Sequence, residues 1–61
     1  MQLDKNEIKN ILHNAMYDYY VIDEIANALD STVMDVTVDP NKIIPNEEKG
    51  YLDVTIRFKL K

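Results

Sequence analysis

The sequence predicts an α+β fold in which one long N-terminal helix packs on a two-stranded antiparallel hairpin. Two observations lead to this class. Apolar residues recur at helical spacing through the first half of the chain, and they alternate with polar residues through two segments of the second half. The length of 61 residues suits one domain, so we expect residues 1–61 to form a single α-β-β unit.

The helix is expected over about residues 5–29. Asp4 and Glu7 have the spacing of a capping box at its N-terminus, and Leu3 and Ile8 occupy the two positions of a hydrophobic staple. An apolar stripe then continues in steps of one, three or four residues, which fits one face of a helix. The stripe comprises Ile8, Ile11, Leu12, Ala15, Met16, Tyr19, Ile22, Ile25, Ala26 and Leu29.

The segment 17–22 argues against an unbroken helix. It is rich in aromatic and β-branched residues, which fit strands better than helices. A kink or short break near Asp18 to Tyr20 is therefore one alternative, and a strand that includes residues 19–22 is another. Because the stripe continues without interruption, we expect packing to override propensity and favour the single helix.

Two strands are expected after the helix, over about residues 33–39 and 51–60. The turn-forming residues 30–32 separate the helix from the first strand, and Pro40 ends that strand. Each strand has one apolar face. These faces comprise Met34, Val36 and Val38 in the first strand, and Leu52, Val54, Ile56, Phe58 and Leu60 in the second.

The connection between the strands, residues 40–50, contains the adjacent isoleucines Ile43 and Ile44. Three interpretations are open. The two residues can extend the first strand past a bulge, cover the edge of the core, or form a contact point for another molecule. Cover of the core is the preferred interpretation.

A hairpin of two strands is marginally stable in water, since three or more strands are usually needed. The second strand is ten residues long and leaves one edge unpaired, which invites another strand beside it. We therefore expect a homodimer in which two hairpins form one four-stranded sheet. In the alternative, Arg57, Lys59 and Lys61 are charged residues that keep this edge monomeric.

The composition argues against catalysis and against bound cofactors or metals. The chain has no cysteine, one histidine (His13), one serine (Ser31) and one glycine, so neither a nucleophile–base pair nor a glycine-rich phosphate loop can be placed. The segment 39–44 lacks the alternating oxygen ligands and central glycine of a calcium loop. We therefore expect that the chain is not an enzyme. No apolar run has the length of a membrane span, so we expect a cytoplasmic protein.

The charge is unevenly distributed along the chain. The net charge is −4, yet residues 10–41 contain no lysine or arginine. The acidic residues of that block are Asp18, Asp23, Glu24, Asp30, Asp35 and Asp39. Such a surface repels phosphate and favours a basic partner, so we expect no direct binding of nucleic acid. The alternative is that the charge serves solubility alone.

The side of the expected helix opposite the apolar stripe carries large side chains where a polar surface is normal. We expect this side to bind a partner because exposed tyrosines are common at interface hot spots. Its residues are His13, Tyr17, Asp18, Tyr20, Val21, Asp23 and Glu24. The alternatives are a homodimer contact, or tyrosines that lie along the surface with their hydroxyls in water. The outward face of the last strand, with Tyr51 and Arg57, is too weakly basic for nucleic acid.

These features predict a small acidic protein-binding module, an inhibitor or adaptor that docks on a basic, nucleic-acid-handling protein. In size, acidity and asparagine content the chain resembles the small phage-encoded proteins that inhibit host machinery, anti-CRISPR and anti-restriction proteins among them. That resemblance implies action in a host cytoplasm and assigns no role to any residue. The alternative function is a structural or assembly subunit, in which the same helix side and the strand edge drive homo-oligomerisation.

Overall fold

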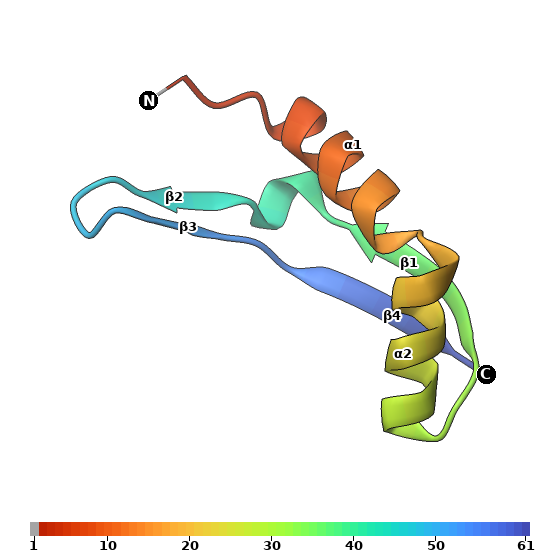
Figure 1. Cartoon of the computed structure of the whole chain (residues 1–61). Helices are drawn as coiled ribbons and strands as arrows, with labels where there is room; N and C mark the ends of the chain where they lie inside the picture. Colours follow the sequence, from red (N-terminus) through yellow and green to blue (C-terminus); the bar gives the residue numbers. More distant parts are fainter. Residues whose placement is uncertain (1) are drawn as a thin grey trace.

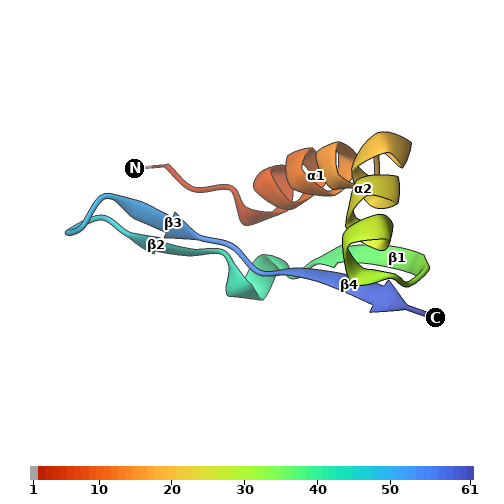
Figure 2. The same ribbon diagram turned by 60° about the horizontal axis from the view of Figure 1, so that its bottom comes forward.

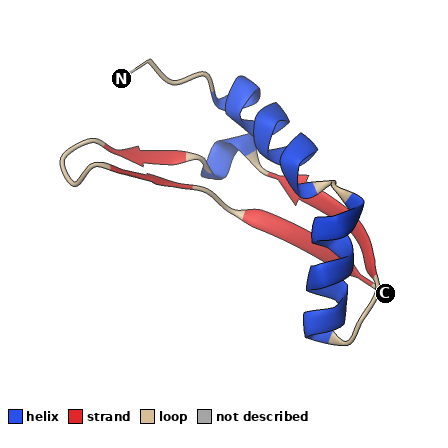
Figure 3. Ribbon diagram, viewed as in Figure 1, coloured by secondary structure: helices blue, strands red, loops and turns tan. Residues whose placement is uncertain are grey.

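A computed structural model of the chain describes residues 2–61 and has the α+β architecture (Figures 1 and 3). Two helices precede the strands, which form two separate antiparallel pairs, β1 with β4 and β2 with β3. The elements in chain order are α1 (Lys5–Met16), α2 (Tyr19–Leu29), β1 (Val33–Val38), the short 3-10 helix η1 (Pro40–Lys42), β2 (Ile44–Asn46), β3 (Tyr51–Asp53) and β4 (Ile56–Leu60).

The prediction of one continuous helix over residues 5–29 is wrong, because the helix breaks at Tyr17 and Asp18. The expected start is confirmed, since the Asp4 side chain accepts a hydrogen bond from the Glu7 N–H at 3.0 Å. Asp18 adopts an extended backbone and caps a second helix, so the chain changes direction between α1 and α2 (Figure 2). The break therefore falls where the alternative interpretation of segment 17–22 placed it.

The β1–β4 pair forms the floor on which both helices lie (Figures 1 and 2). Val36 pairs with Phe58 and Val38 with Ile56, so the apolar faces of the two strands coincide. A bulge between Val33 and Asp35 adds Met34 as an extra residue. The expectation that Met34 shares the core face is wrong, because the bulge leaves its side chain 56% exposed.

The expected strand boundaries need three corrections. The first strand ends at Val38 rather than residue 39, and the second is interrupted at residues 54–55 between β3 and β4. Within the connection, Ile44–Asn46 forms the unpredicted strand β2, which pairs with β3 in a hairpin arm (Figure 1). The Asn46 side-chain Oδ1 accepts a hydrogen bond from the Lys49 N–H at 3.1 Å. Gly50 takes a left-handed conformation (φ 74°) that closes the turn.

The core is small. Only Val36, Val38 and Ile43 are buried among residues 2–61, and neither helix contains a fully buried side chain. Ile43 is fully buried, as core cover requires, whereas its neighbour Ile44 is 55% exposed. None of the helices described in the structure is long and apolar enough to cross a membrane.

The molecule is elongated. Its Cα radius of gyration is 13.2 Å, whereas a compact chain of this length would have a value of about 10.5 Å. The β2–β3 arm accounts for much of the difference, since it extends away from the helices and from β1–β4 (Figure 1). The single chain therefore leaves much of its apolar surface in water.

Candidate functional site

The end of α1 brings together two of the residues expected to bind a partner. His13 and Tyr17 lie one helical turn apart and their rings stack, with centroids 5.3 Å apart and an interplanar angle of 28°. The Tyr17 N–H donates to the His13 carbonyl at 2.9 Å and closes the last turn of α1. His13 is half-buried and Tyr17 is 46% exposed, so the stacked pair presents the tyrosine to solvent.

Asp18 positions the start of α2. Its Oδ1 accepts hydrogen bonds from the Tyr20 N–H at 2.9 Å and the Val21 N–H at 3.4 Å, which satisfies two free amides of the first turn. The negative charge also lies at the positive end of the helix dipole. Asp18 therefore has a structural role in addition to its place on the expected binding side.

Replacing this cap tests whether it causes the helix break. The variant Asp18→Ala is expected to destabilise the protein by about 1 kcal/mol, because two amides lose their acceptor. Since alanine favours the helix interior, the variant should also gain helical signal in circular dichroism as α1 and α2 merge. Asp23→Asn, on an exposed position of α2, is the control and should change neither quantity, because asparagine and aspartate have similar helix propensities.

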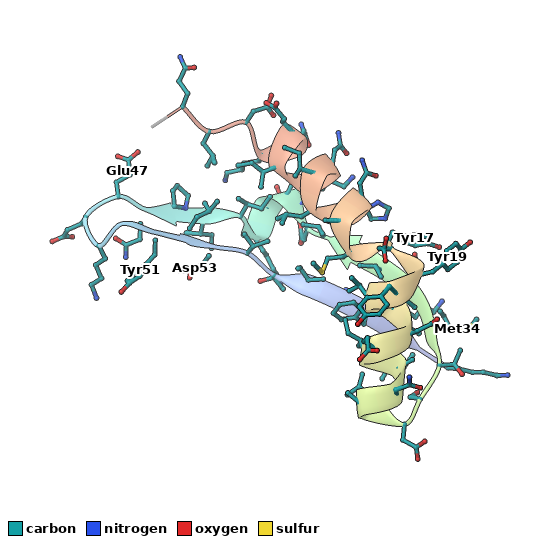
Figure 4. The ribbon with its side chains drawn as sticks, in the orientation of Figure 1. Tyr17, Tyr19, Met34, Glu47, Tyr51 and Asp53 are labelled. Atoms are coloured by element: carbon teal, nitrogen blue, oxygen red, sulfur yellow. The ribbon has the colours of Figure 1, made fainter. Side chains whose placement is uncertain are left out.

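The three aromatic side chains at the junction between α1 and α2 are exposed. Tyr19 is 82% exposed and Tyr20 is 72% exposed. Figure 4 shows Tyr17 and Tyr19 close together at this junction, on the side away from the β2–β3 arm. The assignment of Tyr19 to the apolar core stripe is therefore wrong. The break resets the helical phase, and recognition of Asp18 as an N-cap in the sequence would have favoured the break over a continuous helix.

The remaining expected residues lie on α2. Asp23 and Glu24 are exposed, whereas Val21 is half-buried. Asp23 follows Tyr19 by four residues, and Glu24 follows Tyr20 by four, so each acid lies one turn along the helix on the same side as its tyrosine. We name this surface the tyrosine corner; it comprises Tyr17, Asp18, Tyr19, Tyr20, Asp23 and Glu24. The His13 ring stacks on Tyr17, and the half-buried Val21 follows these tyrosines in α2.

Met34 is a further exposed apolar side chain, on β1. The β1 bulge exposes it, and Figure 4 shows it on the same side of the molecule as Tyr17 and Tyr19. Because no lysine or arginine occurs in residues 10–41, the surface combines apolar area with negative charge alone. The alternating pattern around Met34 gave no signal of this exposure, since a bulge is not visible in a period of two.

The described surface carries depressions of about 230, 400 and 480 Å³. The smallest is lined by Lys9, Lys42 and Arg57 together with Asp39 and neighbouring residues of β1. The depression of about 400 Å³ is lined by residues of α1, His13 among them, and by residues of β1. The two larger volumes fall within the range of small-molecule pockets, which begins at ~300 Å³. Among residues 2–61 no group of three or more histidine, aspartate or glutamate side chains could hold a metal ion.

The outward face of the β1–β4 pair carries the basic residues of the last strand. Lys59 lies opposite Asp35 in the register, and Arg57 lies opposite Thr37. Tyr51 belongs to the separate β2–β3 arm, where it points away from α1 (Figure 4). The structure therefore does not gather these side chains into one basic and aromatic groove of the kind that binds single strands.

The chain was compared with protein-family models, curated proteins and solved structures, and none of the three comparisons finds a significant match.

Proposed function

We propose that this chain is a non-catalytic protein-binding module that acts in the cytoplasm. Its working surface is the tyrosine corner, and its partner is a basic protein that handles nucleic acid. By covering a phosphate-binding groove of that protein, the module acts as an inhibitor or adaptor, as small phage-encoded inhibitors do.

The exposure of the tyrosines at a fixed helix junction carries the proposal. Tyr19 and Tyr20 are more than two thirds exposed, and the Asp18 cap holds the first turn of α2 that presents them. Rigid aromatic side chains lose little conformational entropy on binding, and such residues dominate interface energies. The surrounding negative charge complements a groove that otherwise binds phosphates.

Affinity capture with matched variants tests the proposal. Immobilised wild-type chain, the double variant Tyr17→Ser/Tyr20→Ser and the control Tyr51→Ser are each exposed to a nuclease-treated bacterial lysate. Tyr51 is 64% exposed but lies on the arm, outside the tyrosine corner. We expect wild type and the control to retain a basic nucleic-acid-binding protein, and the double variant to bind it at least about tenfold more weakly.

Two further observations make the capture decisive. Added duplex DNA should displace the retained protein, since it competes for the same groove, and circular dichroism should show that the double variant is folded. If wild type and a folded double variant retain the same proteins, the tyrosine corner is not the binding surface. If DNA leaves a captured protein in place, the groove-covering part of the proposal is wrong.

A structural or assembly role is the second candidate, and the elongated shape of the single chain favours it. In this proposal two copies join their hairpins into one four-stranded antiparallel sheet, so that the homodimer completes the fold. The two candidates are compatible. The tyrosine corner lies across the molecule from the β2–β3 arm, so a dimer formed through β4 leaves the corner free for a partner (Figure 4).

A further inference from the structure

We infer that two copies pair along β3 and β4 in one defined antiparallel register, with Ile56 on the two-fold axis and with α2 of each copy covering the arm of the other. This inference rests on the shared sheet proposed above and specifies its geometry. A second copy of this chain therefore covers the apolar surfaces of the arm and of α2.

The surface area of the single chain matches the requirement of a dimer. The chain of 7.1 kDa exposes 4932 Å² to solvent. A compact monomer of that mass would expose about 4,100 Å² by the usual scaling. The excess of roughly 800 Å² is close to the area that each partner contributes to a stable protein–protein interface.

The backbone leaves one edge of the molecule open for pairing. The Val36 N–H donates a hydrogen bond to the side-chain Oδ1 of its neighbour Asp35 at 2.9 Å and not to β4. Val36 and Phe58 are therefore a non-hydrogen-bonded pair, in which the backbone N–H and C=O groups of both residues point away from the partner strand. Pro45 has no N–H and lies opposite Leu52, so the backbone groups of Leu52 also face outward. Because backbone N–H and C=O groups alternate in direction along a strand, those of the even-numbered residues 52–60 all point to the free edge of β3 and β4.

The other edge is protected. Pro40 and Pro45 interrupt it, the Asp35 side chain occupies the Val36 N–H, and α1 lies over β1 (Figures 1 and 2). No proline or glycine occurs in residues 51–61, so the β3–β4 edge carries none of these interruptions. A second copy can therefore add its strand only on the β3–β4 side.

Charge and apolar pattern select the register. With Ile56 opposite Ile56 of the second copy, Asp53 lies opposite Lys59 and Thr55 lies opposite Arg57. On the helix-bearing face the same register pairs Leu52 with Leu60 and Val54 with Phe58. Every pair on that face is apolar, and every pair of charges on the outward face has opposite signs.

Neighbouring registers are less favourable. An axis at Arg57 places Arg57 opposite Arg57 of the second copy, and an axis at Phe58 places Arg57 opposite Lys59. Both pairs of like charges are repulsive. Moving it to Thr55 places Leu60 opposite Gly50, which has a φ of 74° and belongs to the turn. The register centred on Ile56 is therefore the one that uses the whole segment 51–61.

Three half-exposed leucines become covered in this arrangement. Leu29 is 53% exposed, Leu52 is 40% exposed and Leu60 is 44% exposed. Figure 1 shows the last turn of α2 projecting past the free edge of β4 near its C-terminal end. Since Leu60 pairs with Leu52 of the second copy, the arm of that copy lies beneath this turn, where Leu29 covers it.

Substitutions at Thr55 test the register, because Thr55 has no partner in β1 and faces Arg57 of the second copy. Thr55→Asn provides a neutral baseline for Thr55→Asp and Thr55→Lys. Relative to that baseline, Thr55→Asp should lower the dimer dissociation constant about tenfold through two symmetry-related charge pairs. Thr55→Lys should raise it by a similar factor. Sedimentation equilibrium measures all three constants.

The control Asn41→Asp changes the net charge by the same amount on η1, and its dimer constant should stay within about twofold of wild type. If Thr55→Asp and Thr55→Lys both weaken the dimer, Thr55 faces itself and the register is wrong, while the shared sheet stands. If neither changes the constant, the interface does not include this edge. A wild-type chain that is monomeric at millimolar concentration overturns both the register and the shared sheet, but leaves the tyrosine corner to its own test.

Discussion

Ile43→Ala is expected to remove at least about a third of the stability of this protein. Ile43 has no exposed surface and is one of three buried side chains in the described chain. Truncating a fully buried isoleucine costs about 3 kcal/mol through lost apolar contact and the cavity that remains. A domain of this length has a total stability of roughly 3–9 kcal/mol, so the loss is large.

The neighbouring residue provides the control for this prediction. Ile44 is 55% exposed, so Ile44→Ala should cost below about 1 kcal/mol. Urea titration followed by circular dichroism measures both free energies of unfolding at one protein concentration. Equal losses for the two variants would show that the chain does not bury Ile43 selectively.

Phe58→Ala is the second change with a large expected effect, about 3 kcal/mol. Phe58 lies opposite Val36 on the helix-bearing face of the β1–β4 pair, where its large side chain is half-buried beside the small core. In the proposed dimer Phe58 also lies opposite Val54 of the second copy. If that dimer forms, it stabilises the folded chain by mass action. The free energy of unfolding should then rise with protein concentration in wild type, and should rise less in Phe58→Ala.

Tyr51→Ala is the matched aromatic control. Tyr51 is 64% exposed on the arm, so its loss should cost under about 1 kcal/mol in the same urea titrations. A Phe58→Ala variant as stable as Tyr51→Ala would contradict the strand register that places Phe58 opposite the buried Val36.

The sequence was sufficient for the fold class and for part of the local structure. The Asp4 cap and the pairing of the apolar faces of β1 and β4 follow from spacing and period, which act over short distances. Ile43 as core cover follows from the cost of leaving adjacent isoleucines in water.

Two features depart from the preferred predictions because they shift a pattern along the chain without ending it. Asp18 ends one helix and begins the next, and the apolar stripe continues through the break because the spacing on either side is still helical. The bulge at Met34 likewise changes which face a side chain occupies without altering the alternation that follows. Both shifts expose side chains assigned to the core, Tyr19 and Met34, and Tyr19 becomes part of the candidate binding surface.

The native mass of the wild-type chain tests the central claim, that two copies complete one sheet, most directly. Sedimentation equilibrium over a range of micromolar to millimolar concentrations should give a mass that approaches about twice the 7.1 kDa of the single chain. A mass that stays at that of the single chain across the whole range would contradict the claim.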